Sequence, residues 1–421
     1  MRAEELRDFV RTTDNGGYSD LIMTESPRAR VVDWYGQLSK ALDNAAVHRC
    51  TQQSLVGLED YRTVDRFSKS ENWACILGYE ELAEGFSNRS LSSKIQDDTI
   101  GPVWGHTVIG MDGEEHRLHR GLIAQAFTRK SIQRWNDNVV APIVDGLIDR
   151  IGDRGRVDLA AEFTLFFPAF VITEMMGLPA AEVAQFHHWS AETIMAFHDL
   201  PRALRASKRL EEYLTPIIAT RRESPGDDLI SLLVQAELEG RKLTDIEIVS
   251  FGRMLLNAGG ETTYRSTGSL LLYLLRHPDQ LEQVRNDRAL LPAAIEEGLR
   301  IEPPLASISR VAVADTTVAG VDLPEGTIVE MGMGMANRDP RRWTNPTAFD
   351  IHRKRLPHMA FAWGPHTCLG THLARLEMTT AINALLDRLP GLRLDPDADR
   401  EPLIQGIGLR SPNCVPVVFD Q

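Results

Sequence analysis

The sequence lacks the features that mark several large classes of protein. Its 421 residues include only four cysteines and no Cys-x-x-Cys pair, so neither a disulfide framework nor a zinc ribbon is indicated. No apolar run approaches the roughly 18 residues of a membrane span, and the start lacks the apolar core of a signal peptide. A formal net charge of -13 argues against general nucleic-acid binding, which needs a basic face. We therefore expect a cytoplasmic protein with no membrane span and no nucleic-acid partner.

What remains is a composition ordinary for a globular protein, with 43% hydrophobic and 25% charged residues. Length alone favours more than one domain, but no repeat, low-complexity block or linker divides the chain. Long helical patterns dominate from about 114 to 301, and alternating β-branched residues with turns follow between Leu305 and Met335. The sequence predicts a mainly α fold with a smaller β portion, formed by residues 1–421 as a single domain.

The most informative stretch is 361–370, Phe-Ala-Trp-Gly-Pro-His-Thr-Cys-Leu-Gly. Cys368 lies between a glycine-containing loop and an amphipathic helical run that begins at Thr371. Gly364 and Gly370 permit backbone turns and the close approach of a flat ligand. The positive end of a helix favours a thiolate over a thiol at a cysteine just before the helix start. A thiolate is a soft, strongly donating metal ligand, and haem iron is one metal that accepts a single cysteine.

This run resembles the haem-binding loop of the cytochrome P450 family, Phe-x-x-Gly-x-His-x-Cys-x-Gly. For an isolated cysteine, a buried thiol beside a loop is the better interpretation, so the rest of the chain must supply what a haem needs. The resemblance implies the cytochrome P450 fold, with haem b between a long kinked distal helix and the helix that follows the cysteine loop. Cys368 would be the axial ligand of the iron. The five fixed positions of the pattern are all present as Phe361, Gly364, His366, Cys368 and Gly370.

A long helical pattern over 243–275 is interrupted at 258–263 by Ala-Gly-Gly-Glu-Thr-Thr. Each glycine in a helix interior costs about 1 kcal/mol relative to alanine, which indicates a close approach to the backbone or a bulge. The alternative is a glycine pair tolerated in a kinked core helix. The stretch is similar to the family's oxygen-activating sequence, which implies a catalytic acid–alcohol pair, Glu261 and Thr262, beside the haem contacts Ala258 and Gly259.

Further haem contacts follow from the resemblance. His116 and Arg120 are four residues apart and share a helical face, after Asp112 as the candidate cap. Taken alone, this pair is a solvated charged face. The family places a similar His-x-x-x-Arg pair on the haem propionates, and it implies the same role for Arg310 and His366.

A second charged group has a structural interpretation. Glu297 and Arg300 are three residues apart and can pair on one helical face, where a surface pair would contribute only about 0–1 kcal/mol. The resemblance instead implies a buried network in which Arg353 is the third member and which fixes the loop carrying Cys368. Removing one member of such a network typically costs about 3–5 kcal/mol.

The resemblance implies a monooxygenase that inserts one oxygen atom from O2 into an apolar small molecule. The chain has no flavin or nucleotide fingerprint, so electrons would come from separate proteins, a ferredoxin and its reductase, and the enzyme would act as a monomer. Three alternatives are a peroxide-using haem-thiolate enzyme, a non-catalytic haem sensor and a haem-free helical binding module. The candidate basic residues for partner docking are Arg117, Arg129, Lys130, Arg134 and Arg375.

The substrate itself is not specified by the sequence. The resemblance nominates mostly apolar pocket residues, which suit a terpenoid, steroid, fatty acyl or polyketide skeleton. Trp363 and Phe361 would lie near the sulfur and limit water there. The pocket candidates are 104–108, 186–197, Leu255, 305–308 and 404–407.

Overall fold

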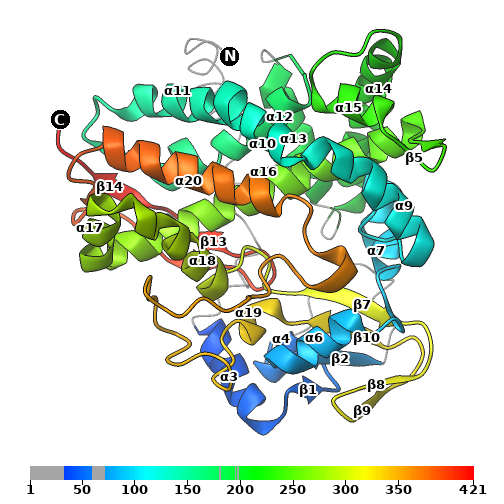
Figure 1. Ribbon diagram of the computed structural model, residues 1–421. Coiled ribbons are helices and arrows are strands. Elements are labelled where there is room, and N and C mark those ends of the chain that lie inside the picture. Colours follow the sequence, from blue (N-terminus) through cyan, green and yellow to red (C-terminus); the bar gives the residue numbers. More distant parts are fainter. Residues whose placement is uncertain (1–32, 59–71, 180–181, 195, 197–198) are drawn as a thin grey trace.

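The computed structural model describes residues 33–58, 72–179, 182–194, 196 and 199–421. Helices fill one side of the molecule, and the largest sheet lies at the other, beneath them in the view of Figure 1. The helices are α3 (Trp34–Asn44), α4 (Gln52–Leu55), α6 (Tyr79–Ser87), α7 (Ile95–Thr99), α8 (Gly101–Trp104), α9 (Gly113–Ala124), α10 (Arg129–Trp135), α11 (Ala141–Ile151), α12 (Phe167–Met175), α13 (Val183–Ile194), α14 (Leu200–Glu223), α15 (Leu229–Gln235), α16 (Asp245–Arg276), α17 (Pro278–Asn286), α18 (Leu291–Ile301), α19 (Met333–Ala336) and α20 (Thr371–Arg388).

The largest sheet joins segments that are far apart in the sequence. Its strand order is β1-β2-β10-β7-β3, with β2 and β10 parallel and the other pairs antiparallel. A second sheet, β11-β14-β4, places the last strand of the described chain beside residues 156–158. The strands of these two sheets are β1 (Val47–His48), β2 (Trp73–Ile76), β3 (Leu91–Ser92), β4 (Arg156–Asp158), β7 (Ile308–Ala312), β10 (Ile328–Met331), β11 (Arg393–Leu394) and β14 (Pro416–Val418).

Three two-stranded ribbons complete the β portion. They are β5 (Glu237–Leu238) with β6 (Arg241–Lys242), β8 (Thr316–Val318) with β9 (Val321–Leu323), and β12 (Ile404–Gln405) with β13 (Ser411–Pro412).

Helix α16 runs through the middle of the helical side and organises it. Its first turn is closed by a capping box, in which Thr244 and Glu247 each satisfy the other's backbone N–H. Most of its 32 residues are buried, because α12, α14, α18 and α20 all pack on it. A helix surrounded in this way needs apolar side chains on several faces rather than on one stripe.

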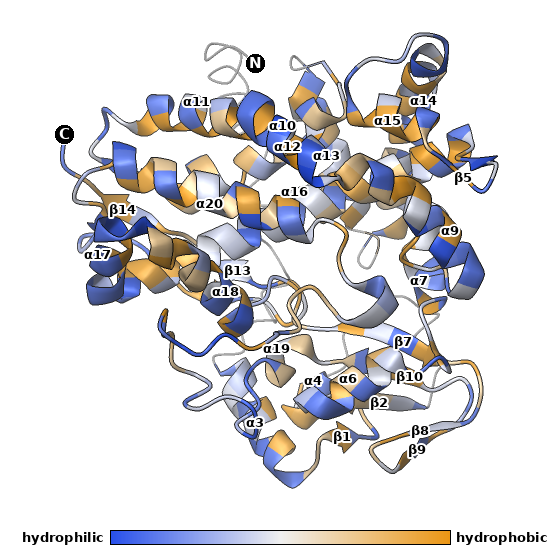
Figure 2. Ribbon diagram, viewed as in Figure 1, coloured by the Kyte–Doolittle hydropathy of each residue, from blue (hydrophilic) through white to orange (hydrophobic). Residues whose placement is uncertain are grey.

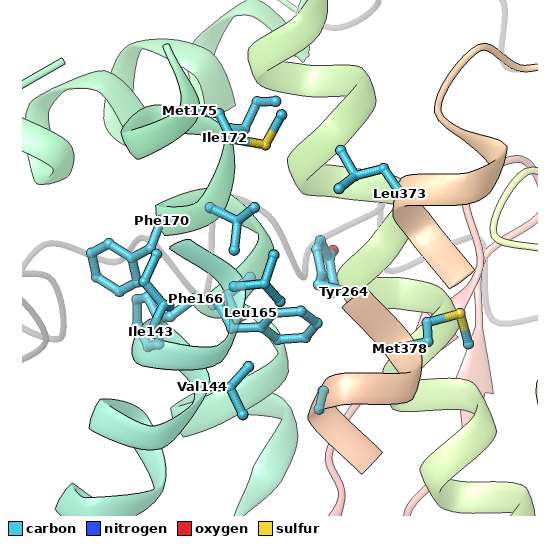
Figure 3. Packing of buried hydrophobic residues seen from close by; sticks show 14 of the residues in the cluster. Ile143, Val144, Leu165, Phe166, Phe170, Ile172, Met175, Tyr264, Leu373 and Met378 are labelled. Atoms are coloured by element: carbon cyan, nitrogen blue, oxygen red, sulfur yellow. The ribbon is translucent and has the colours of Figure 1, made fainter. Parts of the chain in front are cut away.

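The core follows from this arrangement. Figure 3 shows buried side chains of α11, α12, α16 and α20 meeting around Phe166, Tyr264 and Met378. The outer helices, such as α9 and α17, carry both hydrophilic and hydrophobic residues, as expected of helices with one solvated face (Figure 2). A separate apolar cluster, which includes Val329 and Met331, lies at the large sheet.

The prediction of a mainly α fold with a smaller β portion is confirmed. Between residues 72 and 104 the chain forms β2, α6, β3, α7 and α8. These elements are short, and β2 and β3 are completed by distant strands, so local periodicity does not reveal them. Within the described ranges, no helix combines the length and apolar character that a membrane crossing requires.

The interruption expected at 258–263 is also absent, since α16 is helical throughout. The glycine pair instead lies against α12. A Cβ added at Gly259 would lie 3.1 Å from Ile172 Cδ1, and one at Gly260 would lie 3.8 Å from Ala169 Cα. Close packing against α12 therefore accounts for Gly259, whereas a Cβ at Gly260 would make only an ordinary van der Waals contact.

Candidate active site

The cysteine loop is a closed turn in front of α20. Gly364 has φ +74°, a conformation that favours glycine, and its carbonyl accepts a hydrogen bond from Thr367 N at 3.1 Å. Cys368 N donates at 2.9 Å to the carbonyl oxygen of Phe361, seven residues earlier, and this bond closes the loop. Thr371 Oγ1 donates to Cys368 O at 2.6 Å and ties the loop to the first turn of α20. The motif spacing thus fixes where the sulfur emerges.

Cys368 is accessible to solvent, but its thiol is surrounded by enough protein atoms to shift its pKa. Cys368 is exposed, yet burial raises the pKa of its thiol, against the opposing effects of Gly370 N–H, Thr371, Arg120 and Arg375. The Gly370 N–H lowers the pKa of the thiol, in the direction that a helix start favours, but burial outweighs this effect in the protein without a bound metal. A coordinated metal ion would reverse that balance, since it deprotonates a ligating thiol.

Beside the loop lies a group of side chains that carry or can carry positive charge. His116 and His366 have ring centroids 4.0 Å apart, and His116 also feels the charges of Arg120 and Arg310. Burial and these neighbours lower the pKa of His116 to about 4. Burial lowers the pKa of Arg310 to about 10. We call His116, Arg120, Arg310 and His366 the cationic cluster.

Several donors of the cationic cluster lack strong partners. Nε2 of His116 is buried without a hydrogen-bond partner. Arg310 Nη1 donates only a 3.3 Å bond to the carbonyl of its neighbour Ser309, and Arg120 Nη2 donates to Thr367 O at 2.5 Å. Buried donors and cations without acceptors are costly unless a ligand satisfies them. The donor set therefore fits the carboxylates of a haem.

One carboxylate moderates this charge. Asp112 precedes α9 as expected, but its side chain does not cap the helix. It accepts from Ser92 Oγ at 2.5 Å and Ser93 N at 2.9 Å, and it lies 3.3 Å from His366 Nε2. Burial would raise its pKa, but these hydrogen bonds prevail and lower it to about 2. Asp112 thus stays ionised and joins α9, β3 and the cysteine loop.

On α16, the side chain of Ala258 is exposed and that of Thr262 is partly exposed, although residues 251–257 and 260–261 are buried. Thr262 Oγ1 donates to Ala258 O at 2.8 Å. The face of α16 that carries Ala258 and Thr262 is therefore accessible in the middle of the helix, although most of the residues around it are buried. Gly259, next to Ala258, is also partly exposed.

Glu261 is buried and is not bonded to Thr262. Its Oε2 accepts from Arg265 Nη2 at 3.1 Å and from Arg265 Nε at 3.2 Å, within the same helix. Arg265 Nη1 donates onward to Ser411 Oγ at 3.1 Å. Burial raises the pKa of Glu261, and the guanidinium opposes that shift. Motif comparison had no means of finding Arg265, because it follows the motif.

The structure joins Glu297, Arg300 and Arg353 in one buried network. Arg300 donates to both oxygens of Glu297 at 2.8 Å, and Arg353 Nε donates to Glu297 Oε1 at 2.9 Å. The remaining guanidinium nitrogens bind carbonyl oxygens of Asn337, Thr344, Asn345, Pro346 and Ala348. This network holds the irregular segment that precedes the cysteine loop.

Two further buried charged groups escaped sequence reasoning. Glu377 lies on α20, and burial raises its pKa to about 8, with Thr263 of α16 in hydrogen-bonding contact. Glu302 binds Arg338 at 3.3 Å and Arg410 at 2.5 Å. The partners of Glu302 and Glu377 lie on other elements, so the local sequence does not indicate these pairs. For Glu377, the one available signal is its spacing within α20, which places it among buried neighbours.

Two residues expected beside the sulfur and the substrate differ in exposure. Trp363 is 37% exposed, and its role in limiting water at the sulfur stays a prediction. Phe186, expected to line a pocket, is fully buried against Tyr213 at a centroid distance of 4.5 Å. Positions 195 and 197 of the same range lie outside the described residues.

Three of the five basic residues proposed for partner docking are already paired with carboxylates. Arg117 binds Glu114 at 2.7 Å and Glu239 at 2.9 Å. Arg375 binds Glu296 at 2.6 Å, and Arg134 lies 3.5 Å from Asp227. Their positive charge is therefore largely compensated locally, which leaves Arg129 and Lys130 as the candidates with the least compensation among the five.

An exposed cysteine before α20, a neighbouring cationic cluster and an exposed position in the middle of the long helix α16 together fit the class of haem-thiolate proteins. Comparison with known proteins agrees. The family model described as "Cytochrome P450" matches residues 82–413. The chain belongs to the cytochrome P450 family, and it is an oxidoreductase of the monooxygenase type with a haem-thiolate cofactor and O2 as a reactant.

Relatives and solved structures cover most of the chain. It is 39% identical to cytochrome P450 107B1 of Saccharopolyspora erythraea over 300 residues, which are 71% of this chain and 73% of that protein. It is 32% identical to steroid C26-monooxygenase of Mycobacterium tuberculosis over 404 residues, 94% of this chain and 98% of that one. The structure of CYP109E1 from Bacillus megaterium in complex with testosterone matches with a TM-score of 0.79 and 29% identity, over 92% of this chain and 99% of that one.

Proposed function

We propose that the chain, acting as a single domain over 1–421, binds haem b and inserts one oxygen atom from O2 into an apolar small molecule. The observation that carries the proposal is the pairing of an exposed cysteine, Cys368, with a cationic cluster in which His116 and Arg310 are buried and His116 Nε2 has no hydrogen-bond partner. Bound haem supplies reduction and cleavage of O2, chemistry that no side chain provides.

Each residue of the site has a role that follows from its position. Cys368 ligates the iron, and Arg120 stabilises the thiolate because its charge acts directly on that sulfur. His116, Arg120, Arg310 and His366 would hold the propionates, and His116 Nε2 would gain the partner that it lacks here. Ala258 and Gly259, exposed and partly exposed on α16, would contact the bound group. Phe361, Gly364 and Gly370 shape the loop that presents the sulfur.

Glu261 and Thr262 deliver protons on the distal side. Thr262 Oγ1 already bonds Ala258 O and can release that bond to orient a water molecule. Burial raises the pKa of Glu261, which makes its carboxyl a better proton holder than an exposed glutamate. In this structure its carboxylate is held by Arg265, and its transfer role requires that Glu261 leave that partner.

A ferredoxin with its reductase is the proposed electron source, with the protein as a cytoplasmic monomer. Since Arg117, Arg134 and Arg375 are paired, docking depends on Arg129, Lys130 and on exchange of the existing ion pairs. The proposed substrate is an apolar small molecule. Two observations support that class: the apolar character of the nominated pocket residues and the testosterone complex of the Bacillus megaterium relative.

The test begins with the absorption spectrum. Reduced wild-type protein with carbon monoxide should show the red-shifted Soret band that a thiolate ligand produces. Cys368→Ser should abolish that band. A colourless protein after haem supplementation, or an unchanged spectrum in the variant, would overturn the assignment.

The relay is tested separately in reconstituted turnover. Thr262→Ala should consume reductant and release hydrogen peroxide in place of oxidised product. Thr263→Ala provides a neighbouring threonine as the control. Equal coupling in the wild type and Thr262→Ala would remove the relay role and favour a peroxide-using enzyme, which a peroxide-driven assay measures directly.

A further inference from the structure

A buried polar junction connects three helices near the middle of α16. Asn257 Nδ2 donates to Thr193 Oγ1 at 2.7 Å, and Asn257 Oδ1 accepts from Ser190 Oγ at 3.0 Å. Trp104 Nε1, at the end of α8, donates to the same Thr193 oxygen at 3.4 Å. We call Trp104, Ser190, Thr193 and Asn257 the Asn257 junction.

Three members of the junction are buried, and the hydrogen-bonding groups of Thr193 and of the Asn257 amide have partners. Asn257 is 2% exposed, Thr193 1% and Ser190 5%. Thr193 accepts from two donors and gives its own proton to Ser190 O at 2.7 Å. The second proton of the Asn257 amide goes to Arg253 O at 3.2 Å. An apolar side chain would fill this position equally well. The amide of Asn257 therefore serves to bind specific partners on another helix, Thr193 and Ser190.

Its location places it at the accessible part of α16. Asn257 directly precedes Ala258, the exposed residue, and lies about one turn before Thr262. Helices α8, α13 and α14 all pack on α16. Ser207 of α14 donates to Val103 O of α8, so α8 is tied both to α13 and to α14. The junction thus holds α8 and α13 together over the same stretch of α16.

We propose that Asn257 is a positioning residue that fixes α8 and α13 over α16 and so limits the size of the molecule that reaches the distal face. The inference rests on the proposed function, because it takes α16 as the helix that faces the haem. A large apolar substrate enters only when the Asn257 amide releases Thr193 and Ser190. Apolar helix faces slide past one another by small steps, whereas a buried hydrogen bond is either made or broken, so it acts as a gate.

The experiment measures the association of two iron-binding probes with the ferric holoenzyme by stopped-flow absorption. Clotrimazole is bulky, and imidazole is small, yet both bind through an azole nitrogen. Thr193→Val keeps the side-chain shape and removes the oxygen shared by Asn257 and Trp104. It should raise the association rate of clotrimazole about tenfold, which corresponds to about 1.4 kcal/mol, and leave that of imidazole unchanged.

The chain offers a matched control. Thr173 on α12 is also fully buried, but its hydroxyl donates at 2.9 Å to Ala169 O of its own helix. Thr173→Val makes the same chemical change without breaking a link between helices, so clotrimazole should bind at the wild-type rate. Thr193→Ser keeps the hydroxyl and should restore slow entry.

Asn257→Leu tests the junction from its other side. Because Asn257→Leu and Thr193→Val both remove the bond between Asn257 and Thr193, their effects on the association rate of clotrimazole should not add in the double variant. The inference is overturned if clotrimazole binds both variants at the rate of Thr173→Val. It is also overturned if imidazole is accelerated as much as clotrimazole, which would indicate general loosening. A wild-type protein without the thiolate spectrum would instead refute the proposed function, so the two failures are distinguishable.

Discussion

Two groups of buried arginines in this protein differ in what their donors bind. In the network around Glu297, each guanidinium nitrogen of Arg300 and Arg353 donates to a carboxylate or a backbone carbonyl. In the cationic cluster, Arg310 donates only to its neighbour's carbonyl and His116 Nε2 has no partner. Each group contains one pair of residues at helical spacing in the sequence, Glu297 with Arg300 and His116 with Arg120. The use of the donors separates a structural network from a ligand site.

The difference has a physical basis. A buried charge that is fully hydrogen-bonded fixes the segments that supply its acceptors, and here these are the carbonyls of 337–348. A buried cation with spare donors destabilises the protein alone and stabilises a complex with an anion. Removing a charge should therefore have opposite effects in the two groups: it should destabilise the protein in the network and stabilise the haem-free protein in the cationic cluster.

The largest effect is expected from breaking the satisfied network. Glu297→Gln leaves two buried guanidinium groups without their anion, so the free energy of unfolding should fall by about 3–5 kcal/mol. Urea unfolding of the variant and the wild type measures this. Glu282→Gln is the control, because Glu282 and Arg285 have the same spacing on a more exposed face. That change should cost at most about 1 kcal/mol, and an equal cost for both variants would contradict the distinction.

Glu377 extends the comparison to a buried acid, because no cation is among the groups that act on its carboxyl. Burial raises the pKa of Glu377 to about 8 from an ordinary value of 4.5. At pH 7 the folded protein therefore keeps Glu377 neutral, whereas the unfolded chain ionises it. The associated stability is complete below pH 4.5 and is lost progressively as the pH rises through about 8.

Glu377→Gln should remove this dependence. The variant should be more stable than the wild type by about 3 kcal/mol at pH 7, and the difference should vanish near about pH 4.5. Thermal or urea unfolding across that range is the measurement. A difference that does not change with pH would show that Glu377 keeps an ordinary pKa in the folded protein.

The smallest effect is expected from removing one charge of the cationic cluster, but its sign should depend on the ligand. Arg310→Met should stabilise the haem-free protein by about 1 kcal/mol, because it removes a desolvated cation. It should also accelerate haem dissociation about tenfold, since a charge-assisted bond to a propionate is lost. Haem transfer to apomyoglobin and unfolding of the haem-free protein measure the two effects.

Arg300→Met is the matched control, another buried arginine replaced by the same residue. It should destabilise the protein with and without haem, because its carbonyl and carboxylate partners lose their donor. If Arg310→Met also destabilises the haem-free protein, Arg310 belongs with the structural network and its place in the cationic cluster is wrong.

The sequence by itself determined the cysteine loop and its helix, the long helix α16 and the pairing of Glu297 with Arg300. These features depend on neighbours within about ten residues: glycine conformations, a capping box and one helical face. Local spacing is a sufficient guide to contacts of that kind.

Only the tertiary structure decided the rest. The glycine pair of α16 proved to lie against α12, Glu261 proved to bind Arg265, and Asp112 proved to bind β3 and the cysteine loop instead of capping α9. Burial of Cys368 set its pKa against the helix dipole, and the Asn257 junction joined three helices. Burial and the choice among competing hydrogen-bond partners depend on elements remote in the sequence, so no local pattern specifies them.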